Sequence, residues 1–185
     1  MKSRLAPIGA NKLAPRPGAM VHRWLQGYIP QVVSTLAAPN GAAGKVFLTG
    51  FEVENDVVVD AISHGNGDSV AGNIIVGIYG PLVTNETCLG APVAVQSAST
   101  ALAGTTTPQL ISLTPTRLER GRYYVALEYS DTTTRYYRLT TQTILLGSQG
   151  QFYDRGGGYG ALTDPCPAVT NTATTLTVPR VRCVP

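Results

Sequence analysis

The sequence predicts an all-β fold, an antiparallel β-sandwich of jelly-roll type with about eight strands and an extended N-terminal arm. Three observations lead to this prediction. The chain holds 20 glycines and 13 prolines among 185 residues, and both residue types weaken helices. Its apolar runs are short and are separated by turn residues. Hydrophobic residues make up 43% and charged residues only 14%, which is typical of a chain that folds around a core.

The expected strands follow one another at intervals of roughly 10–15 residues, a spacing that favours an antiparallel sandwich. They are residues 47–53, 56–64, 73–79, 92–96, 109–113, 122–129, 135–146 and 174–184. Alternation gives two of them a clear apolar face, which predicts two sheets packed together. The side chains on these faces are Ile74, Val76 and Ile78 in one strand and Tyr123, Val125, Leu127 and Tyr129 in the other.

Turn residues separate these strands. Residues 65–68 (GNGD) supply the glycine and asparagine that tight turns need, and residues 114–121 form a second expected turn region. Pro179 interrupts the last strand. Because proline cannot donate a backbone hydrogen bond, we expect that strand to lie at a sheet edge.

The first 24 residues differ from the rest of the chain, and we expect two parts: a basic, proline-rich arm (1–24) and a β-sandwich domain (25–185). The arm has no acidic residue, whereas the remainder has nine basic and 11 acidic residues. An anchoring arm that orders against a partner and a frayed terminus both fit this pattern. Nucleic acid is not favoured as the partner, because aromatic residues do not accompany the charges. The basic residues are Lys2, Arg4, Lys12, Arg16 and Arg23.

The cysteines and histidines do not indicate a metal or cofactor. Cys88, Cys166 and Cys183 are an odd set without a C-x-x-C spacing. A bridge between Cys166 and Cys183 stays open as an alternative to reduced cysteines. No apolar stretch approaches the roughly 18 residues that cross a bilayer, so we expect no membrane insertion.

Searches for catalytic patterns favour a protein that is not an enzyme. No G-x-S-x-G elbow is present. His64 directly follows Ser63, and neighbours on a strand point to opposite faces, so we expect His64 to be an exposed strand-end residue. Four carboxylates have the even spacing that would place them on one face, as glycosidase acids require, but a polar outer surface predicts the same pattern. They are Glu52, Glu54, Asp56 and Asp60.

The most unusual segment is residues 151–160 (QFYDRGGGYG). We interpret it either as a recognition or docking loop, with aromatic faces for stacking, or as a plain mobile loop between the last two strands. Should the tyrosines belong to the core instead, the turns at residues 65–68 and 84–88 are the next candidates for recognition. The candidate loop residues are Phe152, Tyr153, Asp154, Arg155 and Tyr159.

The order of several short motifs resembles a β-sandwich module of tailed-bacteriophage virion proteins, found in tail-fibre, collar and head-appendage proteins. The motifs are residues 28–30 (YIP), 50–53 (GFEV), 73–79 (NIIVGIY), 91–93 (APV), 118–127 (LERGRYYVAL) and 158–162 (GYGAL). The resemblance covers residues 28–184. Two positions depart from it: the loop before Val93 reads LGAP instead of containing Pro-Gly, and Tyr124-Val125 stands where Tyr-Trp is usual.

This resemblance implies a structural role without catalytic residues or cofactors. The expected protein is a virion component, assembled in the host cytoplasm, that forms a homo-oligomer, with a trimer favoured. Its expected partners are other virion proteins, with a host-surface glycan as a further candidate. A stand-alone carbohydrate-binding module is the alternative, although a lectin would not need a basic arm.

Overall fold

The computed structural model describes residues 23–25, 44–82, 87–136, 138–139, 150–156, 158–172, 176–177 and 179–184. These residues form strands, turns and bends, and they include no helix that is long and apolar enough to cross a membrane. The strands are β1 (Arg23–Leu25), β2 (Lys45–Val53), β3 (Val57–Gly65), β4 (Asn73–Tyr79), β5 (Val93–Gln96), β6 (Thr100–Ala101), β7 (Pro108–Leu118), β8 (Gly121–Tyr129), β9 (Arg138–Leu139), β10 (Gly150–Asp154), β11 (Thr170–Thr172), β12 (Leu176–Thr177) and β13 (Arg180–Val184).

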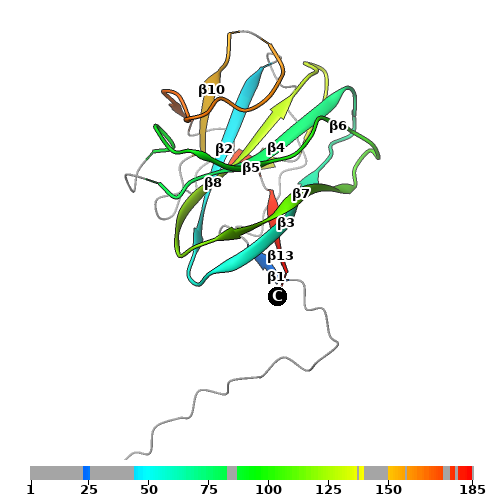
Figure 1. Ribbon diagram of the computed structural model, residues 1–185. Helices are drawn as coiled ribbons and strands as arrows, with labels where there is room; N and C mark the ends of the chain where they lie inside the picture. Colours follow the sequence, from blue (N-terminus) through cyan, green and yellow to red (C-terminus); the bar gives the residue numbers. More distant parts are fainter. Residues whose placement is uncertain are drawn as a thin grey trace, which may run out of the picture.

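The strands form two main antiparallel sheets, which confirms the expected all-β class (Figure 1). The small sheet has the order β1-β13-β3-β7, and the large sheet has the order β11-β10-β2-β8-β4-β5, with β6 also paired to β4. A separate pair joins β9 and β12. Consecutive strands often lie in different sheets, as β3 and β4 do, so residues 66–72 pass from one sheet to the other instead of closing a hairpin.

Most expected strands are present within a few residues of their expected bounds, and β4 matches its bounds fully. The turn region expected at residues 114–121 is shorter in the structure: residues 119–120 connect β7 to β8, whereas residues 114–118 continue strand β7, and 116–118 pair with β3. Pro115 is tolerated there since β7 is an edge strand, whose outward N–H positions need no partner. Of the expected strand at residues 135–146, the part from 140 onward lies outside the described residues.

The expected edge position of the last strand is also wrong. Strand β13 pairs with β3 on one side and with β1 on the other. Its first residue is Arg180, directly after Pro179, so the proline precedes the ladder and removes no hydrogen bond from it.

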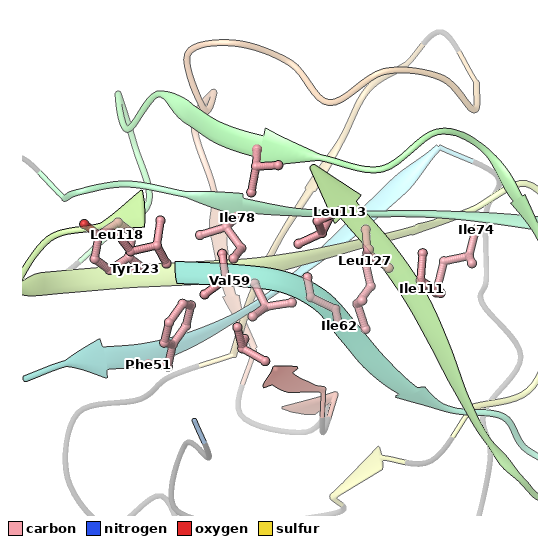
Figure 2. Close-up of a cluster of buried hydrophobic side chains, with 14 of the residues drawn as sticks. Phe51, Val59, Ile62, Ile74, Ile78, Ile111, Leu113, Leu118, Tyr123 and Leu127 are labelled. Atoms are coloured by element: carbon pink, nitrogen blue, oxygen red, sulfur yellow. The ribbon is translucent and has the colours of Figure 1, made fainter. Parts of the chain in front are cut away.

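The inner core fills the space between the two sheets, and Figure 2 shows side chains from both sheets meeting there. The large sheet contributes the apolar faces expected from alternation, including Ile74, Val76 and Ile78 of β4 and the odd-numbered residues 123–129 of β8. From the small sheet, Val59, Ile62, Ile111, Leu113, Leu118, Val181 and Cys183 pack against them.

The large sheet buries its second face as well. Two segments, residues 87–92 and 158–169, lie over that face, and we call them the covering segments. They bury an outer cluster whose members from the sheet are Val46, Leu48, Ile75, Tyr79, Tyr124, Ala126 and Tyr153. The covering segments add Cys88, Ala91, Leu162 and Cys166. The domain therefore has three layers: small sheet, large sheet and covering segments.

Strand β1 ties the N-terminal side of the chain to the sandwich. Arg23, Trp24 and Leu25 pair with Cys183, Arg182 and Val181 at the edge of the small sheet (Figure 1). The boundary expected after residue 24 therefore falls inside this strand. The remaining basic residues of the expected arm lie outside the described residues: Lys2, Arg4, Lys12 and Arg16.

Candidate functional site

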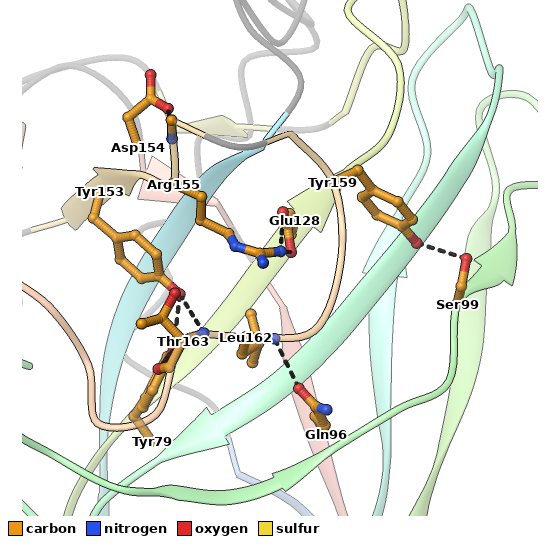
Figure 3. Close-up of polar contacts among 11 residues, drawn as sticks. Tyr79, Gln96, Ser99, Glu128, Tyr153, Asp154, Arg155, Tyr159, Leu162 and Thr163 are labelled. Carbon is orange, nitrogen blue, oxygen red and sulfur yellow. Dashed lines mark hydrogen bonds and ion pairs between the residues drawn. The ribbon is translucent and has the colours of Figure 1, made fainter.

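The segment at residues 151–160 is not one loop. Residues 150–154 form strand β10, which pairs with β2 and β11 in the large sheet. The chain leaves the sheet after Asp154 and reaches the second covering segment (Figure 3). Because side chains alternate along a strand, Phe152 and Tyr153 point to opposite faces of the sheet.

Tyr153 belongs to the outer cluster, where it is buried. Its hydroxyl lies 2.7 Å from the hydroxyl of Tyr79, which donates to the carbonyl oxygen of Thr163 at 2.7 Å (Figure 3). Burial raises the pKa of both tyrosines, so both hydroxyls keep their protons. Tyr153 therefore holds the covering segment to the sheet, and its ring is enclosed.

Phe152 packs partly buried against the inner core. The ammonium group of Lys45, on the neighbouring strand β2, lies 4.2 Å from the centre of the Phe152 ring. This is a cation–π contact. One face of the ring is therefore already occupied by a residue of the same sheet.

Arg155 forms an ion pair with a buried carboxylate instead of pointing into solvent. Its Nη1 lies 3.2 Å from Oε1 of Glu128, whose side chain is fully buried on the outer face of β8. Burial raises the pKa of Glu128, and the charge of Arg155 opposes this effect. Asp154 is exposed, and its carboxylate accepts a hydrogen bond from the backbone of Gly156 at 2.9 Å.

Tyr159 is half-buried against the outer cluster. Its hydroxyl lies 2.8 Å from that of Ser99. Close by, the backbone N–H of Leu162 donates to the side-chain oxygen of Gln96 at 2.9 Å. These contacts join the second covering segment to β5 and to the residues that follow it (Figure 3).

The structure thus brings Tyr153, Arg155 and Tyr159 to one face of the large sheet, as side chains that attach a covering segment. Sequence reasoning missed their partners Tyr79, Glu128 and Ser99. One signal was present, because Glu128 directly follows the run YYVAL at residues 123–127 and a charge in such a place needs a partner.

His64 is buried, and its expected exposure is wrong. Its ring lies against Tyr129 and Tyr136, with centroid separations of 5.5 and 6.4 Å. Both rings come from outside β3, so the strand end is covered by neighbours that the local sequence does not reveal. Burial lowers the pKa of His64 to about 4, and the neutral, enclosed imidazole is out of reach of a substrate at the surface.

The four carboxylates do not share one face. Glu52 is exposed on β2 of the large sheet, and Glu54 is exposed between β2 and β3. Asp56 binds Arg117 at 2.6 Å, and this contact lowers the pKa of the aspartate. Asp60 forms a two-pronged contact with Arg182 on β13, with both distances 2.7 Å. Two of these acids therefore pair across strands of the small sheet.

In the turn at residues 65–68, Asn66 makes contacts within the fold. The side-chain amide of the buried Asn66 donates to the carbonyl oxygens of Ala103 and Gly104 and contacts the side-chain oxygen of Gln109 at 3.1 Å. Asn66 thereby fixes the connection that leads into β7. Within the described ranges, no three His, Cys, Asp or Glu residues gather as metal ligands would.

Comparison of the chain with protein-family models, with curated proteins and with solved structures finds no match in any of the three.

Proposed function

We propose that the chain is a non-enzymatic structural component of a tailed-phage virion. In this role it is a fibre, collar, baseplate or head-surface appendage, anchored by its basic N-terminal arm. The observation that carries the proposal is strand β1, which follows the basic segment directly and is hydrogen-bonded to β13. Because β1 is paired at the edge of the small sheet, a partner that binds the basic segment is connected to the whole domain through this strand.

The polar groups of the domain support this proposal. Tyr153, Arg155 and His64 are used inside the fold, and the ion pairs of Asp56 and Asp60 join neighbouring strands. The five basic residues within the first 24 have no acidic neighbour in that stretch. An acidic surface on another virion protein is the complementary partner, and its binding would offset the ordering entropy of the arm.

Two truncations test the anchoring role. Removal of residues 1–22 deletes four of the five basic residues but keeps β1, whereas removal of residues 1–25 also exposes the edge of β13. We expect the shorter truncation to fold with an unchanged unfolding midpoint and to be lost from purified particles. Normal incorporation of this variant would contradict the anchoring role.

Immunogold labelling of purified particles tests the location directly, and gold at one defined position supports the proposal. Sedimentation velocity of the recombinant chain tests the proposed homo-oligomer, for which we favour a trimer. A monomer at micromolar concentration and low salt would contradict oligomerisation of the free protein.

A glycan-binding module is the second candidate, and Tyr159 is the residue that supports it. Tyr159 is half-buried and lies next to the glycine-rich residues 156–160, whereas Tyr153 is buried and Phe152 is covered by Lys45. A glycan array with the full chain separates the two functions. Binding that is lost in Tyr159→Ala without a change in melting temperature would favour the lectin.

A further inference from the structure

Two of the three cysteines meet in the outer cluster. Cys88 comes from the first covering segment and Cys166 from the second, 78 positions later in the sequence. Both side chains are buried, and both cysteines are reduced. The Cys166 side chain is close enough to that of Cys88 to raise the pKa of the Cys88 thiol, so the two side chains are neighbours in this cluster.

Backbone hydrogen bonds hold the two segments that carry Cys88 and Cys166 together. The N–H of Ala91 donates to the carbonyl oxygen of Cys88 at 3.0 Å, which closes a turn with Gly90 at a φ of +76° in its third position. The N–H of Cys166 donates to the carbonyl oxygen of Ala91 at 2.8 Å, and Gly90 donates back to Cys166 at 2.9 Å. The main chains of the two cysteines are therefore held next to each other through one turn.

Cys183 is placed elsewhere. It lies on β13 and packs in the inner core between the sheets, whereas Cys166 packs in the outer cluster. The large sheet separates these two clusters. The pairing of Cys166 with Cys183, which the sequence left open, therefore does not fit this arrangement.

We propose that Cys88 and Cys166 are a dithiol site that forms an intramolecular disulfide with a low-molecular-weight disulfide such as oxidised glutathione. One cysteine thiolate attacks the glutathione disulfide, so that a mixed disulfide forms and one glutathione thiolate leaves. The second cysteine thiolate attacks the protein sulfur of the mixed disulfide and expels the second glutathione. Two electrons pass to glutathione, and the two cysteine protons end on its two thiols.

The reduced form is protected until the covering segments open. Both thiols are shielded from solvent, and the neighbouring Cys166 side chain together with burial raises the pKa of Cys88. A protonated, buried thiol is a poor nucleophile. Oxidation should therefore be slow in the native state and faster in urea below the unfolding transition, because local opening exposes the pair.

The disulfide would tie the two covering segments together. Because it closes a long stretch of chain, it should restrict the unfolded state strongly. We expect a rise in melting temperature of about 10 °C for the oxidised protein. This inference concerns the folded domain alone and does not depend on the proposed virion role.

The test uses the full chain, reduced and then incubated with oxidised glutathione with and without sub-denaturing urea. The protein is then fully unfolded in concentrated urea so that N-ethylmaleimide blocks the remaining thiols, and it is digested without reduction for mass spectrometry. We expect linked peptides that contain Cys88 and Cys166, with N-ethylmaleimide on Cys183. The rise in melting temperature should disappear after addition of dithiothreitol.

Single cysteine variants identify which two cysteines form the disulfide. Cys183→Ser should form the same link as the wild type, whereas Cys88→Ser and Cys166→Ser should form none. Because the peptide map of the wild-type chain is decisive, the test stands even if a variant folds poorly. Three alkylated cysteines after oxidation in urea, a link that contains Cys183, or a glutathione adduct that never resolves would each overturn the proposal.

Discussion

The hydroxyl groups of Tyr79 and Tyr153 form a hydrogen bond of 2.7 Å beneath the second covering segment. Tyr79 uses its single hydroxyl hydrogen for the carbonyl oxygen of Thr163, so Tyr153 is the donor between the two rings. Two strands of the large sheet and one covering segment thus meet in one polar contact inside an apolar cluster. Such a contact stabilises the fold only while each buried group keeps a partner.

Tyr153→Ala should destabilise the domain strongly. The change removes a buried ring and leaves the Tyr79 hydroxyl without its donor, so we expect the free energy of unfolding to fall by about 3–5 kcal/mol. Tyr153→Phe should cost about 1 kcal/mol. Urea denaturation measures both values. Tyr159→Phe is the control, for which we expect the free energy of unfolding to change by less than about 0.5 kcal/mol. If Tyr153→Ala left the stability unchanged, Tyr153 would again be a candidate recognition residue.

Arg155→Ala should cost about 3 kcal/mol, because it leaves the carboxylate of Glu128 buried without its cation. Because Arg155 is half-buried and paired with a buried carboxylate, we do not expect the small effect that is typical of an exposed charge. Arg117→Ala is the matched control, since its pair with Asp56 is exposed and should contribute below about 1 kcal/mol. The double variant Arg155→Ala/Glu128→Gln should regain most of the loss in the same urea assay.

The Arg155→Ala variant should also depend more strongly on pH than the wild type. Burial already raises the pKa of Glu128 against the opposing charge of Arg155, so removal of the arginine raises this pKa further. The native state then holds a proton that the unfolded state has released, so stability falls as the pH rises through this window. We expect the variant to lose less stability at pH 5 than at pH 8. An equal loss at both pH values would contradict a buried, unpaired carboxylate.

His64 should make the domain sensitive to acid. Its pKa is about 4 in the folded protein, below the 6.5 that is usual for a histidine. Between these values the unfolded chain binds a proton that the native state does not bind, so the free energy of unfolding falls as the pH falls, by about 3 kcal/mol in total. Unfolding curves from pH 7 to pH 4 measure this slope. The difference in free energy of unfolding between the wild type and His64→Gln at each pH gives the contribution of the histidine. If the two proteins lost stability in parallel as the pH falls, His64 would make no such contribution.

Gly77→Ala should disturb the packing of the second covering segment against strand β4. A Cβ atom at residue 77 would clash with Cδ1 of Leu162 and would lie 2.9 Å from the carbonyl oxygen of Val95. We expect a loss of about 1–3 kcal/mol from this overpacking. Gly50→Ala, with its nearest contact at 3.4 Å, should cost little. Leu162→Ala should partly relieve the Gly77→Ala clash, and strict additivity of the two changes in a thermal melt would contradict the contact.

The sequence predicted the inner core well because that core follows alternation. Ile74, Val76 and Ile78 share a face in β4 as expected, and the core residues of β8 do so too. Alternation is a local property, and two packed sheets use it directly. The same reasoning could not predict the outer cluster, because Tyr153 and Tyr79 are 74 positions apart and meet only through the sheet order.

The candidate recognition residues illustrate the same limit. A glycine-rich, aromatic segment is typical of an exposed loop, but pairing with β2 and β11 places residues 151–154 within the large sheet, next to its edge strand. Arg155 looked exposed because its partner lies 27 positions earlier, on β8. His64 looked exposed because Tyr129 and Tyr136 cover it from distant parts of the chain. Burial of a polar residue depends on such distant neighbours, which a local pattern does not contain.

The antiparallel pairing of β1 with β13 determines how the domain responds to mechanical load. Arg23 lies opposite Cys183 and Leu25 lies opposite Val181, so the start of β1 and the end of β13 are at the same end of the ladder. Tension applied between these two points would break the backbone hydrogen bonds one after another, as in a zipper, instead of loading them together. Strand β1 would therefore detach at low force while β13 keeps its pairing with β3, and the rest of the sandwich would stay folded under the same pull.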